Sequence, residues 1–321
     1  MNIYLTLDYE LFMGTQSGSV LNCLIKPMNK LVEETHNFGV LFTIFVDAAY
    51  LYKLSEHKDE NEVLRRDYEE ISKQLQNLVA QGHSIQLHIH PQWFYSIYKD
   101  GSWQIDQNHY KLSDIPCENL DTLFLKSKSI LEEIIGKKVS AFRAGGYSLQ
   151  SLSNYPGFLI ENGITIDSSV ASGQHYISDY QWYDYRSVLG GKVYRFNSDI
   201  TKNEGNGQLV EYPISNIRIS TFRYILYRLY LKWMKNIGHP FGDGRPVPSN
   251  QKIKLFKTRI MNYSFDYVMA PMLYHSFIKL KKLGHEDIVL IGHPKNQSRE
   301  SIDELRKFIM KTQKIATYKT I

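Results

Sequence analysis

The sequence predicts an α/β protein whose parallel strands form a closed or nearly closed barrel. Short apolar segments alternate along the chain with amphipathic segments of helical spacing, several of which end at a glycine. Strands that alternate with helices pair in parallel, and the number of such units here suits a barrel. Only residues 183–213 break this alternation, because short β-prone pieces there flank a turn rich in glycine and asparagine.

The first half of the chain supplies three expected strands and two expected helices. Residues 1–8 are apolar enough for a strand, and the run 40–46 is typical of a parallel strand buried on both faces. A third strand ends at Pro91. Helices are expected at 25–38 and 60–81, where apolar residues recur at helical spacing before Gly39 and Gly82.

The second half continues the same alternation on either side of the irregular segment. The expected helices are 119–135, 151–162, 272–283 and 301–312, and the expected strands are 139–142, 164–167 and 288–291. Within the irregular segment we expect short strands at 192–196 and 208–214.

Composition limits the class of protein. Hydrophobic residues make up 43% of the 321 residues and charged residues 22%, as in ordinary soluble domains. Two cysteines allow neither a disulfide framework nor a Cys-type zinc site. No uninterrupted apolar run is long enough to span a bilayer, and no secretory signal is visible, so we expect a cytoplasmic protein.

The net charge of +5 is concentrated in one segment. Ten basic residues and one acid lie between Arg218 and Arg259, so the rest of the chain is slightly acidic. This distribution argues against a nucleic-acid-binding protein and for a local basic surface. Apolar residues recur there at helical spacing. They indicate either an amphipathic helix packed on the barrel or a surface that contacts the inner face of a membrane.

His88 and His90 stand two apart in the apolar run that Pro91 ends. Side chains two apart in a strand face the same way, so the two imidazoles converge. Convergent imidazoles suit a divalent transition metal. Two partly exposed histidines on an edge strand, with no metal between them, also fit the pattern. Asp8 and Glu10 repeat this spacing at the end of the first strand, and two carboxylates so close require either a bound cation or one protonated carboxyl group. A helix N-cap followed by a solvated residue also fits the pair.

Polar residues follow several other expected strands, among them Arg143, Asp167 and His293. The carboxyl ends of barrel strands lie on one face, where the βα loops form active sites. We therefore expect these side chains to meet the two histidines and the two carboxylates there.

Several of these segments resemble, in order, the motifs of the polysaccharide deacetylases with the NodB-type fold, family 4 carbohydrate esterases. Leu5-Thr6-Leu7-Asp8 is similar to the opening motif, and the segments 43–46 and 82–88 are similar to the second strand and the histidine segment. Phe142-Arg143-Ala144-Gly145-Gly146-Tyr147, Ile166-Asp167-Ser168-Ser169 and Leu290-Ile291-Gly292-His293 complete the series. The resemblance covers about residues 1–172 and 285–321.

The resemblance implies a single catalytic domain over residues 1–321, a distorted (β/α) barrel with a β-rich and basic helical insertion at about 183–262. Asp8 would be the catalytic base, Arg143 its charged partner, and His293 the general acid. His88 would bind a divalent metal ion, Zn²⁺ or a similar ion. Asp167 would tune His293 or contact the substrate.

The chain departs from the family pattern at two positions. Tyr9 stands where the family has its second aspartate, so Glu10 becomes the expected carboxylate ligand. Gln92 stands where the family has its second histidine, and His90 is the physical substitute. Trp93 and Tyr147 are expected to contact a sugar, since aromatic rings stack on sugar faces, although Trp93 also fits a core position.

The sequence as a whole thus predicts a metal-dependent hydrolase that removes the acetyl group from an N-acetylated sugar in surface polysaccharide biosynthesis. One alternative is a hydrolase of a non-sugar amide or cyclic imide. The other is a carbohydrate-binding relative whose metal site has decayed, as Tyr9 and Gln92 suggest.

Overall fold

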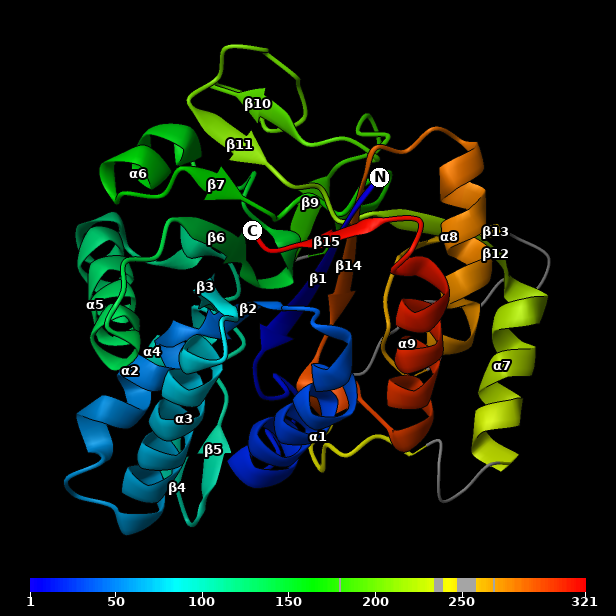
Figure 1. The fold of residues 1–321 in the computed structure, drawn as a ribbon. Coiled ribbons are helices and arrows are strands. Elements are labelled where there is room, and N and C mark those ends of the chain that lie inside the picture. The colour runs from blue at the N-terminus through cyan, green and yellow to red at the C-terminus, as the bar shows by residue number, and fades with distance from the viewer. Residues whose placement is uncertain (179, 234–238, 247–257, 268) are drawn as a thin grey trace.

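The computed structural model describes residues 1–178, 180–233, 239–246, 258–267 and 269–321. Within them one curled, mainly parallel sheet forms a half-barrel with helices around it (Figure 1). The strand order is β10-β11-β7-β6-β3-β2-β1-β14, and β15 pairs with the first half of β1. The strands are β1 Asn2–Tyr9, β2 Thr43–Asp47, β3 Ser84–Ile89, β6 Ala141–Ala144, β7 Ile166–Asp167, β10 Tyr194–Phe196, β11 Leu209–Glu211, β14 Asp287–Gly292 and β15 Thr317–Lys319.

Helices follow most strands, as the alternating pattern predicts. Their bounds are α1 Lys26–Thr35, α2 Ala48–His57, α3 Glu62–Ala80, α4 Gln92–Tyr95, α5 Cys117–Ile135, α6 Tyr155–Glu161, α7 Thr221–Trp233, α8 Leu273–Lys282 and α9 Arg299–Thr312. The sequence analysis did not anticipate α2, which begins directly after β2. The expected helix at 151–162 is shorter in the structure, because only its second half is helical.

Three two-stranded antiparallel sheets lie outside the main sheet in the described part of the chain. They are β4 Ile97–Lys99 with β5 Ser102–Gln104, β8 His175–Ile177 with β9 Trp182–Asp184, and β12 Asn216–Ser220 with β13 Thr258–Asn262. The last of these connects the end of the sheet to α7, which stands at the edge of the molecule beside α8 and α9 (Figure 1).

The two edges of the half-barrel are joined by single residues and not by a regular strand. Residues 212–214 continue from β11 along β7, and the backbone N–H of Ser215 then donates to the carbonyl of Val289 in β14. The carbonyl oxygen of Ser215 accepts a hydrogen bond from the backbone N–H of Tyr263. The carbonyl oxygen of Tyr263 in turn accepts one from the backbone N–H of Ile291 in β14. The predicted barrel is thus present, with one seam made of irregular backbone.

The β-prone part of the expected insertion belongs to the barrel itself. β11 pairs in parallel with β7, with Glu211 opposite Asp167, and β10 then adds an antiparallel edge. The charges at 235, 252, 254 and 257, which contribute to the expected basic segment, lie outside the described residues.

The core on both sides of the sheet is apolar, and β1, β2 and β14 are almost fully buried. This burial explains why their sequences are near-continuous apolar runs, since each strand has covered faces on both sides. Among the described residues no helix is both long and apolar enough to cross a membrane.

Candidate active site

Strand register brings the chemically important residues to the carboxyl end of the barrel. His88 in β3 lies opposite Arg143 in β6, and Asp47 at the end of β2 lies opposite His88. Leu7 in β1 is paired with Gly292 in β14, so Asp8 and His293 follow on neighbouring strands. The parallel pairing of these strands therefore gathers residues that are far apart in the sequence, as the barrel predicted.

Asp8 and Arg143 form a buried ion pair. Nη1 of Arg143 lies 2.5 Å from Oδ1 of Asp8, and the arginine side chain is fully buried. Its remaining nitrogens donate to the carbonyl and hydroxyl oxygens of Ser168 and to the hydroxyl of Thr6. Because nearly every donor has an acceptor, the guanidinium is held in place and fixes the orientation of Asp8.

Glu10, His88 and His90 form a buried cluster whose potential ligand atoms all lie within 4.8 Å of one another. Oε2 of Glu10 lies 3.0 Å from Nε2 of His88 and 2.5 Å from Nε2 of His90. The two imidazole rings are nearly perpendicular, with centroids 4.8 Å apart. His90 lies one residue beyond the end of β3 and still converges with His88, as the spacing predicted.

The donor set of this cluster fits a divalent cation. Nδ1 of His88 lies 2.6 Å from the carbonyl oxygen of Arg143, which can only accept a hydrogen bond. The ring therefore carries its proton on Nδ1 and turns a lone pair on Nε2 toward a carboxylate oxygen. Two acceptors that face each other require a positive charge between them, either an extra proton or a metal ion.

Electrostatics inside the cluster agree with that requirement. Burial lowers the pKa of His88, but the negative charges of Asp8, Glu10 and Asp47 outweigh burial and raise the pKa to about 9. Burial raises the pKa of Glu10, yet Lys295 and the two histidines hold it well below its usual range. The site is thus built around an ionised Glu10 and attracts positive charge.

Lys295 is part of this site, and the sequence analysis missed it. Its Nζ donates to Oε1 of Glu10 at 2.8 Å and to the carbonyl of Leu11 at 2.7 Å, and the side chain is buried. The only feature of the sequence that could have indicated a role for Lys295 is its position two residues after His293. A lysine in a surface loop carries no signature of burial, so sequence alone gave no reason to place it here.

His293 is oriented by Asp266, a second residue that the sequence analysis missed. Oδ2 of Asp266 lies 2.6 Å from Nδ1 of His293, and Oδ1 accepts from the backbone N–H of His293. Nε2 then points inward, 3.8 Å from both Asp8 and Glu10. Burial lowers the pKa of His293, but the charge of Asp266 and its hydrogen bond more than compensate, so the pKa is raised.

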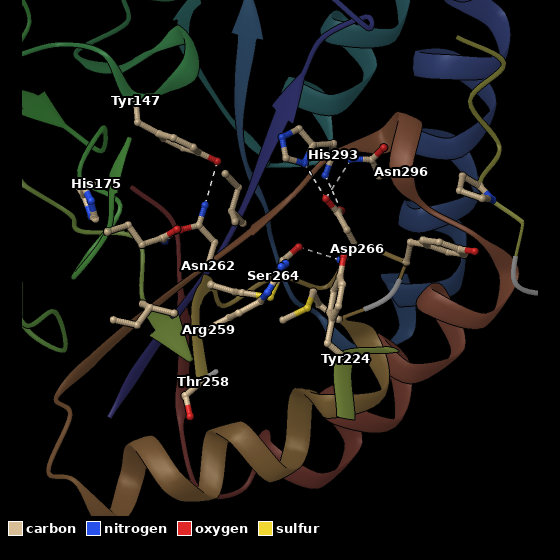
Figure 2. A pocket seen from close by; sticks show the side chains of 17 residues that line it. Tyr147, His175, Tyr224, Thr258, Arg259, Asn262, Ser264, Asp266, His293 and Asn296 are labelled. Atoms are coloured by element: carbon tan, nitrogen blue, oxygen red, sulfur yellow. Dashed lines mark hydrogen bonds and ion pairs between the residues drawn. The ribbon is translucent and has the colours of Figure 1, made fainter. Parts of the chain in front are cut away.

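A cavity of about 870 Å³ opens beside this group of residues. His293 and Asp266 lie at one part of its wall, and Tyr147 and Asn262 form another, with the Tyr147 hydroxyl accepting from the Asn262 amide at 2.9 Å (Figure 2). Tyr224 from α7 and His175 from β8 also line the cavity. Tyr147, which the sequence analysis expected to contact a sugar, is therefore in a position to do so.

Two other expected substrate contacts do not reach the cavity. Trp93 is fully buried, with its ring 4.5 Å from that of Tyr50 and its indole N–H donating to Asp47. Asp167 is also fully buried and accepts both of its side-chain hydrogen bonds from Ser169. For Trp93 the core interpretation is correct, because the helix that carries it turns the ring inward against α2.

The residues that depart from the family pattern are displaced from the site or support it. Tyr9 is buried away from the ligand cluster, and its hydroxyl donates to Gln74 of α3. Asp47 is the first residue before α2, yet its carboxylate accepts from the backbone of His90 and from Trp93 and caps no helix N–H. Gln92 is fully buried, and its amide has no hydrogen-bond partner among the described residues.

No protein-family model matches the sequence, and no curated protein is similar to it at a significant level. Solved structures are similar in fold. A protein from Mycobacterium smegmatis assigned as a polysaccharide deacetylase matches 98% of this chain over 85% of its own, at 16% identity and a TM-score of 0.53. This chain has the polysaccharide-deacetylase fold.

Two further solved structures match this chain. A GH57 branching enzyme from Thermococcus kodakaraensis matches the whole chain over 70% of its own, at 11% identity and a TM-score of 0.50. The PuuE allantoinase matches 99% of this chain over 87% of its own, at 12% identity and a TM-score of 0.49. The predicted fold class is therefore confirmed, while the reaction has to be argued from the site.

Proposed function

We propose that the protein is a divalent-metal-dependent hydrolase that removes the acetyl group from the nitrogen of an N-acetylated sugar. The convergence of Glu10, His88 and His90 with two separately fixed groups, Asp8 and His293, is the observation that carries this proposal. The deacetylase fold and the ordered motifs support it. We place the reaction in the cytoplasm, on a precursor of a surface polysaccharide.

Each of these residues has a defined part in amide hydrolysis. Glu10, His88 and His90 would hold the metal ion, which when bound supplies Lewis-acid polarisation of the amide carbonyl. Asp8 is oriented by its ion pair with Arg143, so its carboxylate can accept a proton from the attacking water. Nε2 of His293 faces the same region and can donate a proton to the sugar nitrogen as the C–N bond breaks.

The cavity supports a sugar as the group that is deacetylated. Tyr147 and Tyr224 supply aromatic surface there, and Asn262, His175 and Asn296 supply hydrogen-bonding groups. An apolar face combined with a few convergent polar groups is what a sugar ring requires of its binding site.

One contact favours a second candidate, a sugar-binding relative that has lost catalysis. The ammonium group of Lys295 already neutralises Glu10 from inside the cluster. If that charge replaces the metal ion, the cavity still binds a sugar but the amide bond is not cleaved. Metal content separates the two candidates directly.

The test is metal analysis of the purified protein together with acetate release from chitotetraose and UDP-N-acetylglucosamine, with allantoin included as a non-sugar amide. We expect about one divalent ion per chain and acetate release from at least one sugar. The Asp8→Asn variant should lose about 10²–10⁴-fold in turnover, the usual contribution of a general base, and should keep its metal.

Asp114→Asn serves as the matched control, since Asp114 is a carboxylate paired with Lys111 well away from the site in sequence. Protein that binds no divalent ion even at millimolar concentration would support the sugar-binding candidate. Cleavage of allantoin without acetate release would support the non-sugar amidase. Both results overturn the proposed deacetylase.

A further inference from the structure

Helix α7 carries large apolar side chains on its outer surface. The exposed residues are Phe222 at 65%, Leu226 at 49%, Leu229 at 58%, Tyr230 at 44% and Trp233 at 81%. At 3.6 residues per turn these positions fall within an arc of about 100°, so they form one continuous stripe along the helix. We call these five residues the α7 stripe.

This stripe is not what a helix packed on the barrel should show. A soluble helix turns its apolar face inward, and its exposed side is polar. Here Tyr224, on the opposite side of α7, lines the cavity beside His293. Figure 1 shows α7 at the outer edge of the molecule, beyond α8 and α9. Of the two interpretations that the sequence left open, packing of this apolar face on the barrel does not fit the exposure of the α7 stripe.

Positive charge lies beside the stripe and on the opposite side of α7: Arg223 borders the stripe, whereas Arg228 lies on the side of Tyr224. Arg223 and Arg228 on α7 and Arg218 on β12 are exposed, and none forms an ion pair with an acidic side chain in the described part of the chain. The guanidinium groups of Arg228 and Arg259 lie 6.0 and 5.6 Å from the ring of Tyr224. Neighbouring α8 adds three lysines in its last turn, Lys279, Lys281 and Lys282.

We propose that the α7 stripe and its flanking arginines dock the protein on a bilayer that contains anionic lipids. Leu, Phe and Trp side chains on one face of a helix enter the headgroup boundary, and basic residues beside them bind lipid phosphates. The positive charge beside the α7 stripe favours an anionic bilayer over a second copy of this chain as the binding partner. A symmetric pairing of two α7 helices through the stripe would bring two positively charged surfaces together, with Arg223 at the border of the contact on each chain.

Docking at α7 places the cavity next to the membrane, because Tyr224 belongs both to this helix and to the cavity wall. A sugar carried on a membrane lipid could then reach His293 while its lipid portion stays in the bilayer. The docking surface itself does not depend on the proposed hydrolysis, since its test measures binding and not turnover.

The test is flotation with vesicles of phosphatidylcholine alone and of phosphatidylcholine with 30 mol% phosphatidylglycerol. We expect the fraction bound to rise about tenfold with the anionic lipid and to fall at 0.5 M salt. In a Trp182→Phe background, emission from Trp233 should shift to the blue on binding, because Trp93 and Trp103 are buried at the start and Trp182 is the other exposed tryptophan. Leu226→Ser/Leu229→Ser should abolish binding, and Arg223→Gln should reduce its dependence on anionic lipid.

The matched control is Leu189→Ser/Leu283→Ser, which removes two leucines of 85% and 75% exposure outside α7 and should bind vesicles like the unmodified protein. Equal binding of the control and of Leu226→Ser/Leu229→Ser would overturn the proposal. So would a dimer in sedimentation that Leu226→Ser/Leu229→Ser dissociates while no vesicle is bound, because a second copy would then cover the stripe. Circular dichroism of each variant checks that the fold is retained.

Discussion

One buried and one partly buried ion pair decide the geometry of the candidate site at the level of single residues. Arg143 holds Asp8, and Asp266 holds His293, so the base and the acid are fixed independently of each other. Burial of an unpaired charge is costly, and removal of one partner of a buried pair typically destabilises a protein by about 3–5 kcal/mol. This cost applies to Arg143 and Asp8, which are buried, and less to His293 and Asp266, which are partly exposed.

Lys295 is the residue whose charge matters most for metal affinity. Its ammonium group lies 2.8 Å from Glu10, so it repels a divalent cation that binds the same carboxylate. We predict that Lys295→Met, which keeps most of the side-chain volume, tightens Zn²⁺ binding by at least about tenfold, because it removes a positive charge beside a metal ligand. Isothermal titration calorimetry with Zn²⁺ measures the effect.

The control for this substitution is Lys138→Met, because Lys138 pairs with Glu132 on the surface, where 87% of its side chain is exposed. It should leave Zn²⁺ affinity unchanged. Weaker binding by Lys295→Met would contradict the prediction and would mean that Lys295 positions Glu10 for the metal instead of competing with it.

At the level of elements, the turn after β6 shapes the metal cluster. Gly145 follows β6 and lies against the end of β3. A Cβ atom at this position would come within 2.6 Å of the Ile89 carbonyl oxygen and 2.9 Å of Nδ1 of His90. The next residue, Gly146, has φ of +58°, a conformation that glycine adopts without strain. The two glycines thus allow His90 to take the place from which it faces Glu10.

We therefore predict that Gly145→Ala displaces His90 and weakens Zn²⁺ binding by at least about tenfold, with a loss of about 1–3 kcal/mol in stability from overpacking. Calorimetry and urea unfolding measure the two effects. Gly284→Ala is the control: its φ of +78° makes alanine strained, but no atom lies near its Cβ position. That variant should lose stability and keep its metal affinity. An equal loss of Zn²⁺ affinity in Gly145→Ala and Gly284→Ala would contradict the prediction.

At the level of the whole molecule, a pair of buried carboxyl groups links the β10–β11 extension to the barrel. Asp167 and Glu211 lie opposite each other on β7 and β11, both fully buried. Burial raises the pKa of Asp167 to about 7, and burial together with the charge of Asp167 raises the pKa of Glu211 well above its usual range. One carboxyl group therefore stays protonated near neutral pH.

This pair should make the stability of the fold depend on pH. An acid whose pKa is raised in the folded state stabilises the fold below its unfolded pKa of about 4 and loses that contribution as pH rises through the folded pKa. We predict that the free energy of unfolding falls between about pH 4 and pH 8. In the Glu211→Gln variant, which has one ionisable group fewer, the free energy of unfolding should fall less over the same range. Urea unfolding at pH 5 and pH 8 should show the variant roughly 1–3 kcal/mol more stable than the unmodified protein at the higher pH alone.

Glu304→Gln is the matched control, since Glu304 pairs with Lys307 on the exposed side of α9 and should leave the pH dependence unchanged. A Glu211→Gln protein that is less stable by the same amount at both values of pH would show that the carboxyl pair contributes hydrogen bonding alone.

The sequence predicted the units of the fold well because burial leaves a direct trace in it. Strands covered on both faces must be apolar throughout, as in β2 and β14, and long helices such as α3 and α5 must repeat their apolar residues every three or four positions. Short elements leave no such trace. For this reason β4, β5 and β15 were not anticipated, and α6 was predicted too long.

The sequence by itself determined which residues two positions apart face the same way, and so it paired His88 with His90 and Asp8 with Glu10. Only the tertiary structure decided what else stands beside them. Asp266 and Lys295 belong to the site because they contact His293 and Glu10. Trp93 is not a sugar contact, because α4 turns its ring into the core. Local periodicity is set by the backbone, whereas contacts between distant segments depend on packing and register that no short motif records.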